Sequence, residues 1–216
     1  MNATAKERPI LFSAPMVRAI LAGQKTQTRR VVKPQPDRER NLVWARGASG
    51  QWGPFTMYYN QHDRTGWGPL EIPMHCPYGQ PGDRLWVKET HLAWWKIDPD
   101  KPEGPRIFSH VAAFAADGYE LEHGERWIPS IHMPRAASRI LLEITGVRVE
   151  RLQDISQADA YAEGAMSWAQ EQDTPIKDLN GGDDRMAFMA LWESIGGAGS
   201  WEANPWVWVV EFRRIV

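Results

Sequence analysis

Short strand-like and helix-like segments alternate irregularly along this chain of 216 residues. Runs of β-branched and aromatic residues predict strands at residues 25–32, 84–90, 107–115, 138–150 and 206–215. Apolar residues at helical spacing predict helices between Ser13 and Gly23 and at residues 156–163 and 184–195. This order lacks the regular βαβ alternation of a parallel sheet. It therefore predicts an α+β fold, in which short helices flank a small, mixed or mostly antiparallel, barrel-like sheet.

Two stretches of the chain interrupt these regular segments. Residues 37–80 are rich in Gly, Pro, Asn and Trp and show little periodicity, and residues 96–106 are rich in Pro and charged residues. The chain is long enough for one domain with a sizeable core. We therefore expect a single domain over residues 1–216, with large loop insertions near residues 34–78 and 96–136.

Cysteine usage and hydropathy indicate the compartment. Cys76 is the only cysteine, so no internal disulfide can form, which is typical of a reducing environment. No apolar run approaches the roughly 20 residues of a membrane span, and the N-terminal residues lack the pattern of a signal peptide. We expect a cytoplasmic protein without a membrane partner. The sequence does not determine the oligomeric state, and we expect a monomer.

Charge is distributed unevenly along the chain. The net charge is only −2, yet residues 1–40 carry nine Lys and Arg residues against three Asp and Glu residues. Such a local excess of positive charge can hold an anionic partner. An exposed, solvated basic face explains the same count equally well.

Familiar phosphate-binding and metal-binding motifs are missing from the sequence. It contains neither a glycine-rich nucleotide loop nor an H-E-x-x-H or paired C-x-x-C motif. His75 and Cys76, with His62 or His91, match no standard metal-site spacing. We therefore predict neither a metal nor a cofactor.

Three residues nevertheless have side chains suited to chemistry. Lys25 follows a helix end, where it is either a surface lysine favoured by the helix dipole or an enclosed amine with a lowered pKa. Thr28 is either an ordinary strand residue or a hydroxyl that attacks or orients a substrate. Glu163 ends its helix at the dipole's negative end, which is unfavourable unless a cation such as Lys25 lies beside it.

The segment from Ile20 to Arg30 closely resembles the signature of the ASCH domain family, a branch of the PUA-like folds. The family pattern is a helix that ends in Gly, followed by Lys-Thr-x-Thr-x-Arg, and Lys25, Thr26, Thr28 and Arg30 match it. The later segment Gly82-Asp83-Arg84-Leu85 is similar to the family's Gly-Asp-x-Leu strand entry. The chain also resembles the larger ASCH proteins of phages and prophages, which implies a location in the bacterial host cytoplasm.

The resemblance implies an activity and a set of site residues. Small bacterial ASCH proteins include a hydrolase that removes the acetyl group from N4-acetylcytidine with a Lys, a Thr and a Glu. These positions fall on Lys25, Thr28 and Glu163, so the resemblance implies a metal-independent amidohydrolase acting on N4-acylated cytosine nucleosides. We also predict contacts with the substrate, from Thr26, Arg29, Arg30, Tyr78 and Trp86. Alternation along an extended segment predicts that Arg29 and Arg30 point to opposite faces.

Two alternatives stay open at the level of sequence. Other ASCH relatives bind or cleave RNA, and the basic residues 1–40 are compatible with an RNA-binding or single-stranded nucleic-acid-binding module or a ribonuclease of phage origin. An inactive structural or regulatory phage protein is the third possibility, because one fold hosts many functions.

Overall fold

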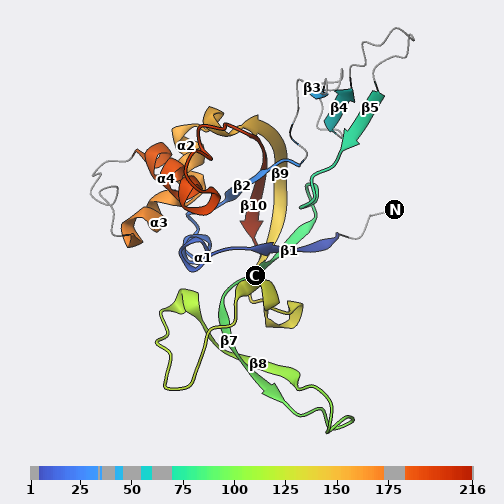
Figure 1. Ribbon diagram of the computed structural model, residues 1–216, viewed down its shortest axis with the longest axis vertical. Coiled ribbons are helices and arrows are strands. Elements are labelled where there is room, and N and C mark those ends of the chain that lie inside the picture. Colours follow the sequence, from blue (N-terminus) through green and yellow to red (C-terminus); the bar gives the residue numbers. More distant parts are fainter. Residues whose placement is uncertain are drawn as a thin grey trace.

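A five-stranded mixed sheet forms the centre of the molecule (Figure 1). The computed structural model describes residues 5–33, 35, 42–45, 55–59, 70–172 and 183–215. The strands lie in the order β1 (Glu7–Leu11), β6 (Arg84–Lys88), β9 (Leu141–Arg151), β10 (Trp206–Arg214) and β2 (Gln27–Val31). β1 runs parallel to β6, and every other neighbouring pair is antiparallel. The predicted α+β class with a mixed sheet is confirmed.

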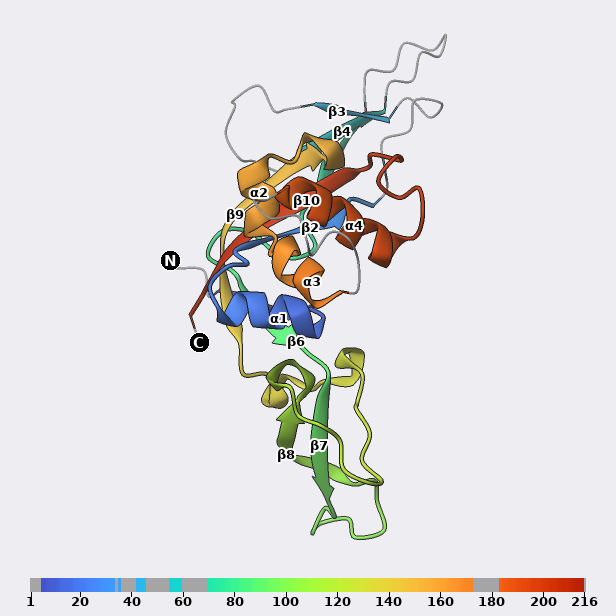
Figure 2. The same cartoon turned by 90° about the vertical axis from the view of Figure 1, so that its left-hand side faces the viewer.

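Among the described residues, four α-helices accompany this sheet and lie on one side of it, in contact with one another (Figures 1 and 2). The helices are α1 (Ala14–Leu21), α2 (Gln157–Ala162), α3 (Ala165–Glu171) and α4 (Asp184–Gly196). The hydrophobic core contains aromatic side chains together with fully enclosed aliphatic ones, such as Ile10, Val17, Leu85, Leu142 and Val209. Each such side chain contributes about 1.5–3 kcal/mol by leaving water.

Local sequence signals explain the helix ends. Ser156 caps α2, because its hydroxyl accepts a hydrogen bond from the Asp159 backbone N–H. α4 begins in the same way, with the Asp183 carboxylate accepting from the N–H of Met186. Gly23 follows α1 with a φ of 75°, a left-handed conformation that favours glycine. The helices predicted at these three places are confirmed.

The strands predicted at residues 84–90, 107–115, 138–150 and 206–215 are confirmed, with ends that differ by a few residues. β1 and α3 were missed. β1 has the sequence ERPIL, which contains a proline and does not alternate apolar with polar residues, although its burial alternates in the structure. α3 directly follows Gly164, a residue type that is typical of a helix end. The bulge expected at Gly146 lies beside that residue, where the register between β9 and β10 shifts by one residue.

A separate three-stranded antiparallel sheet lies within residues 37–80, which corrects the prediction of an irregular insertion. Its strands are β3 (Leu42–Ala45), β4 (Phe55–Tyr59) and β5 (Leu70–Met74). Each strand has only four or five residues, and the segments between them are rich in Gly, Pro and Asn. The sequence therefore shows too little periodicity to predict these strands.

A hairpin arm of β7 (His91–Lys96) and β8 (Ile107–Phe114) projects from the body at the end opposite to β3–β5 (Figure 2). β8 was predicted and β7 was not. Hydrogen bonds fix the base of the arm, since His91 and Ile128 exchange backbone bonds of 3.2 and 2.8 Å and the Ala115 N–H donates to Thr90. No helix among the described residues is both long enough and apolar enough to cross a membrane.

The central sheet has two edges, at β1 and β2, and its ends approach each other through a side chain. The Arg30 guanidinium on β2 donates to the Leu11 carbonyl at the end of β1, at 3.0 Å. This contact comes from a side chain, and β1 and β2 are not paired with each other among the described residues.

Candidate functional site

The loop after α1 is tied to two helices, and this fixes the position of Lys25. The backbone N–H groups of Gln24 and Lys25 both donate to the Ala19 carbonyl, at 2.9 and 3.0 Å. The next N–H, of Thr26, donates to the carbonyl of Ala162 at the end of α2, at 2.9 Å. Residues 24–26 therefore lie directly against the segment that carries Glu163.

Lys25 is enclosed, with only 4% of its surface exposed. Its Nζ donates to three acceptors, which are the Gln27 carbonyl at 2.9 Å, the Glu163 carbonyl at 2.7 Å and the Glu163 Oε2 at 2.9 Å. The ring of Phe12 lies 5.5 Å from the same nitrogen. Three acceptors use all three N–H bonds of an ammonium, so the charged form of Lys25 is fully hydrogen-bonded.

Glu163 is equally enclosed, and it uses its two carboxylate oxygens differently. It is the C-cap residue of α2 and is 3% exposed. Its Oε2 receives the Lys25 ammonium, and its Oε1 receives the Arg29 guanidinium at 3.1 Å. The cation that the position of Glu163 required is therefore present, and it is Lys25, 138 residues away along the chain.

Burial and the carboxylate have opposite effects on Lys25. Desolvation favours the neutral amine, whereas the charge of Glu163 and its hydrogen bond favour the ammonium. The nearby cations Arg29 and Arg30 favour the neutral amine further. Desolvation is the largest of these effects, and the pKa of Lys25 lies below its ordinary value.

Arg29 lies fully inside the protein, between three carboxylates that come from β9 and from α2 with its C-cap. Its Nη1 reaches Glu163, and its Nη2 lies 2.9 Å from Glu150 on β9 and 3.7 Å from Asp159 on α2. The guanidinium also lies over the ring of Phe188 on α4, at 5.8 Å. Its buried Nε has no hydrogen-bond partner in the described part of the chain.

A second set of polar residues surrounds this group, and sequence reasoning did not identify it. The Gln27 side chain donates to the Asp159 carbonyl at 2.9 Å and to its Oδ1 at 3.0 Å. Arg148 donates to Asp159 at 3.0 Å and also pairs with Glu150 and Glu211. One sequence signal could have identified Gln27: side chains alternate along a strand, so Gln27 lies on the same side of β2 as Arg29.

The carboxyl of Asp159 is held in its ionised form. Burial alone raises the pKa of this group, but hydrogen bonds from Ser156 and Gln27 and the charges of Arg29 and Arg148 outweigh it. The net effect is a pKa below the ordinary range. Asp159 is therefore an anion beside Arg29 at neutral pH.

Thr28 and Arg30 lie on the other side of the pleat from Gln27 and Arg29. Thr28 is buried and pairs with Val210 of β10. Arg30 is half-buried, with its guanidinium 5.4 Å from the ring of Phe12, the same ring that lies near Lys25. The expected alternation of the two arginines is confirmed by these separate partners. Thr26 is exposed at the start of the strand.

The remaining candidate residues lie in other surroundings. Tyr78 is half-buried and packs against the hydrophobic core. Trp86 lies on the side of β6 away from Leu85 and Val87, and the cations of Lys88 and Arg135 lie 5.6 and 6.0 Å from its ring. No described contact joins either aromatic residue to Lys25, Thr28 or Glu163.

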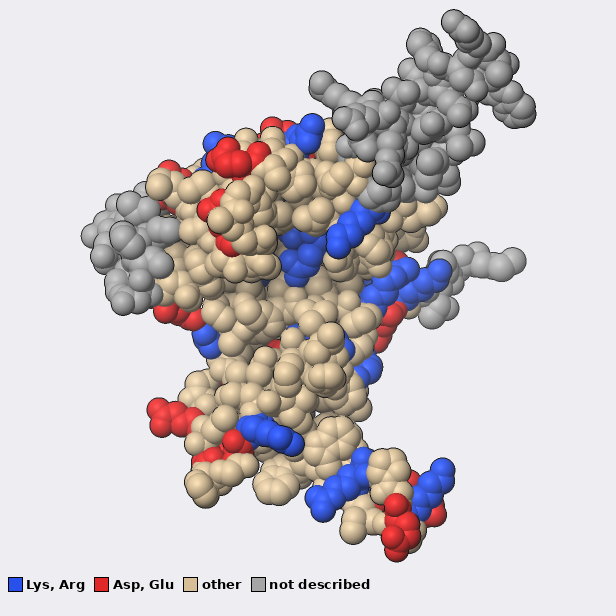
Figure 3. All heavy atoms as spheres, in the orientation of Figure 1, with Lys and Arg blue, Asp and Glu red and all other residues tan. Residues whose placement is uncertain are grey.

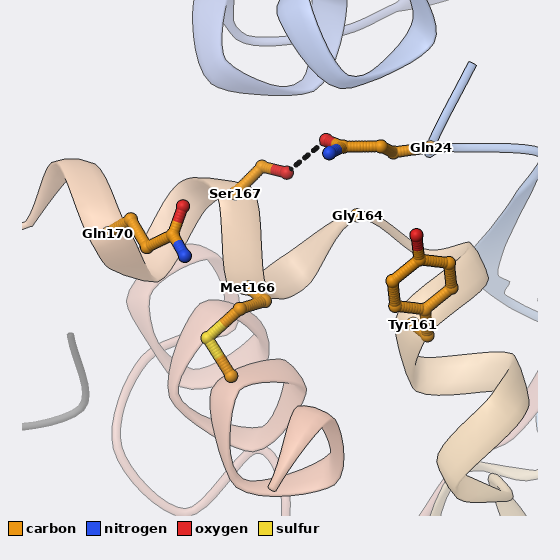
Figure 4. A pocket seen from close by; sticks show the side chains of 6 residues that line it. All are labelled: Gln24, Tyr161, Gly164, Met166, Ser167 and Gln170. Carbon is orange, nitrogen blue, oxygen red and sulfur yellow. Dashed lines mark hydrogen bonds between the residues drawn. The ribbon is translucent and has the colours of Figure 1, made fainter. Parts of the chain in front are cut away.

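A small pocket of about 150 Å³ opens beside the Lys25–Glu163 contact (Figure 4). It is lined by uncharged side chains and one glycine, which are Gln24, Tyr161, Gly164, Met166, Ser167 and Gln170. The Ser167 hydroxyl donates to the Gln24 side chain at 2.6 Å, as Figure 4 shows. Gln24 and Gly164 directly adjoin Lys25 and Glu163 in sequence, but neither catalytic candidate lines the pocket.

Gly164 is required at this place for two reasons. Its φ of 71° lies in the left-handed region. A Cβ there would also stand 2.9 Å from the Cβ of Ala19 and 3.2 Å from that of Lys25. The absence of a side chain therefore lets the start of α3 pack directly on the Lys25 backbone.

The described residues contain no group of three or more His, Cys, Asp and Glu side chains arranged to hold a metal ion. Comparisons of the chain with protein-family models, with curated proteins and with solved structures found no match.

Proposed function

We propose that this protein is an amidohydrolase that removes the acyl group from N4-acylated cytosine nucleosides such as N4-acetylcytidine. We further propose an ASCH-like, PUA-like barrel as its core. One observation carries the proposal: a buried Lys25–Glu163 ion pair, joined across 138 residues, lies beside the strand that carries Thr28. A lysine and a glutamate enclosed together are typical of a site where protons are exchanged.

The proposed reaction begins with proton transfer within the pair. Moving one proton along the 2.9 Å hydrogen bond from Lys25 to Glu163 leaves a neutral amine and a carboxylic acid. The lowered pKa of Lys25 makes this transfer easier than it is in water. The pair then holds both a general base and a general acid.

The bond-making step uses Thr28. Its hydroxyl, or a water that it orients, attacks the acyl carbonyl carbon while the Lys25 amine takes the proton. The Lys25 ammonium that results stabilises the oxyanion. Glu163 gives its proton to the exocyclic nitrogen as the C–N bond breaks, which releases the cytosine amine. Water then releases the acyl group as a carboxylate if Thr28 was acylated. Every step uses a side chain of this protein, without a metal or cofactor.

The substrate must enter a site that is closed in this structure. Lys25, Thr28 and Glu163 are all nearly fully buried. The pocket lined by Gln24 and Gly164 borders both segments that carry the pair. We propose that residues 22–26 and 161–166 separate to admit the modified base.

A nucleic-acid-binding function is the second candidate. Lys and Arg side chains gather across the middle of one face, over the central sheet (Figure 3). Several N-terminal cations are neutralised, however, since Arg8, Arg18, Lys25 and Arg29 all pair with carboxylates outside residues 1–40. The charge count of that region therefore overstates the free positive charge, and this favours the hydrolase.

Hydrolysis of N4-acetylcytidine tests the proposal directly. Purified protein is incubated with the nucleoside, and cytidine and acetate are measured by chromatography. Wild type is expected to release both in equal amounts, and Lys25→Ala to release neither above the level of a protein-free sample. Equal release by wild type and Lys25→Ala would overturn the proposal.

Binding of single-stranded RNA at two salt concentrations tests the second candidate. Phosphate-driven binding by several cations loses about 10³-fold or more in affinity between 50 and 200 mM salt. A gel shift with this salt dependence, together with absent hydrolysis, would favour a nucleic-acid-binding module. Degradation of the RNA in the same sample would indicate a ribonuclease.

A further inference from the structure

Arg29 is the least exposed charged side chain of the site, and it does not face solvent or the pocket. Its guanidinium is enclosed by Glu163, Glu150 and Asp159 and by the ring of Phe188. None of its surface is accessible at the side chain. A substrate that enters from the pocket lined by Gln24 and Gly164 would therefore not contact Arg29, which argues against the direct substrate contact that the sequence led us to expect.

The guanidinium instead divides the two oxygens of Glu163 between two cations. Arg29 Nη1 takes Oε1 at 3.1 Å, and Lys25 Nζ takes Oε2 at 2.9 Å. The second guanidinium nitrogen is anchored to Glu150 at 2.9 Å, so the arginine itself cannot rotate freely. A lysine would not reproduce this geometry, because the two contacts are made by two different nitrogens that the planar guanidinium holds at a fixed separation.

We propose that Arg29 is a positioning residue for Glu163. It holds the carboxylate so that one oxygen faces Lys25, and it prevents both oxygens from turning to the ammonium. This inference rests on the proposed hydrolase function, because it assigns Arg29 a role in the proton exchange between Lys25 and Glu163. The substrate gains no contact from it.

The test separates positioning from substrate binding by measuring kcat and KM for N4-acetylcytidine. Arg29→Gln removes the charge, and Arg29→Lys keeps the charge without the fork. Because a small displacement of a catalytic group costs about 10²-fold in rate, kcat is expected to fall by about that factor in Arg29→Gln and by about 10-fold in Arg29→Lys. KM should stay within about two-fold, since no ground-state contact is lost.

Arg148→Gln is the matched control. Arg148 pairs with Asp159, Glu150 and Glu211 in the same cluster but does not contact Glu163. Its kcat is expected to stay within about three-fold of wild type. A similar fall in Arg148→Gln would mean that the cluster acts only by stabilising the fold, and a raised KM with unchanged kcat in Arg29→Gln would make Arg29 a substrate contact. Either result overturns the inference.

The pH profile provides a readout that a purely structural role would not change. The charge of Arg29 lowers the pKa of Lys25, so its removal raises that pKa. The proposed reaction needs the proton that Lys25 and Glu163 share, so kcat falls at high pH when the pair loses it. The midpoint of this fall should therefore move to higher pH in Arg29→Gln and stay in place in Arg148→Gln. An unchanged midpoint in both variants contradicts positioning.

The inference and the proposed function can fail separately. If wild type does not hydrolyse N4-acetylcytidine, the proposed function fails, and thermal unfolding decides whether Arg29 holds Glu163. The Tm shifts of Arg29→Gln and Glu163→Gln should then be clearly non-additive in the double variant, whereas those of Arg148→Gln and Glu163→Gln should add. Additive shifts for both pairs would show that Arg29 does not hold Glu163.

Discussion

Two buried carboxylates, Glu163 and Glu89, have nearly the same burial but different partners. Glu163 shares its oxygens between Lys25 and Arg29. Glu89, which follows β6 at the base of the hairpin arm, gives both oxygens to Arg139, at 3.0 Å each. Arg139 also holds Asp117 and lies 3.8 Å from the ring of Phe114.

The difference between these two sites lies in which cation can release a proton. Hydrogen bonds and charges from Asp117 and Glu89 outweigh desolvation and raise the pKa of Arg139 above its already high value, so its guanidinium stays charged. Burial lowers the pKa of Lys25 instead. A buried carboxylate joined to an arginine fixes geometry, whereas one joined to a buried lysine can also exchange a proton. We therefore assign a structural role to Glu89 and propose a catalytic role for Glu163.

The largest expected effect is on hydrolysis, and it separates the two carboxylates. Glu163→Gln removes the proposed proton shuttle and should lower kcat by about 10³-fold, within the range of general acid–base catalysis. Glu89→Gln removes an equally buried carboxylate and should leave kcat within about three-fold at a temperature where the protein is folded. Release of cytidine from N4-acetylcytidine measures both. Equal losses of kcat in the two variants would mean that the structural role of Glu89 and the proposed catalytic role of Glu163 are not distinct.

Two threonines extend the comparison: Thr28 on β2, the strand that carries Arg29, and Thr90, which follows Glu89 in sequence. Thr28→Val removes the proposed nucleophile and should lower kcat by about 10²-fold or more, because the attacking oxygen is lost. Thr90 adjoins Glu89, and Thr90→Val should have no measurable effect on kcat. Both variants keep the branched shape of the side chain, so circular dichroism should report folded protein in each. Full activity in Thr28→Val would assign the attack to water without help from this residue.

Much of the fold could be predicted from local patterns, because the clearest segments are long and bounded by clear signals. The strands at 138–150 and 206–215 and the helix at 184–195 combine a run of apolar or periodic residues with a Gly, Ser or Pro boundary. The short strands β3, β4 and β5 could not be identified, since four or five residues carry too little periodicity when Gly and Pro surround them.

Only part of the candidate site could be predicted, from the types of its residues and from the resemblance of residues 20–30 to a family signature. Lys25 and Glu163 were named together because a carboxylate at a helix end needs a cation. The enclosure of Arg29 was not foreseen, because its partner Glu150 comes from β9 and only the register of β9, β10 and β2 brings the two together. Pairing across a sheet depends on long-range register, which no short sequence pattern contains.

A smaller effect concerns the contribution of the Glu89–Arg139 ion pair to the stability of the fold. Arg139→Met leaves Glu89 buried without its cation and should lower the free energy of unfolding by about 3 kcal/mol or more. Arg213→Met breaks an exposed pair with Glu143 and should cost about 1 kcal/mol or less. Urea unfolding of the two variants and wild type measures both values. Equal losses of unfolding free energy in the two variants would mean that Glu89 is not isolated from water. Burial would then not distinguish the Glu89–Arg139 pair from a surface pair.

The smallest expected effect is a pH dependence that only the Lys25 site should show. The folded pKa of Lys25 lies below the ordinary value of 10.5, so between these two values the unfolded chain binds more protons than the folded one. The free energy of unfolding of wild type should therefore rise with pH in that window, relative to Lys25→Met, by up to about 1.4 kcal/mol per pH unit. Below the folded pKa both states carry the proton, and the difference between the two proteins is constant. Arg139 stays charged in both states, so the difference between wild type and Arg139→Met should not change over the same range. Urea unfolding from about pH 7 to pH 10.5 measures both differences. A constant difference for Lys25→Met would mean that Glu163 fully offsets the burial of the ammonium, and Lys25 would then be as fixed a cation as Arg139.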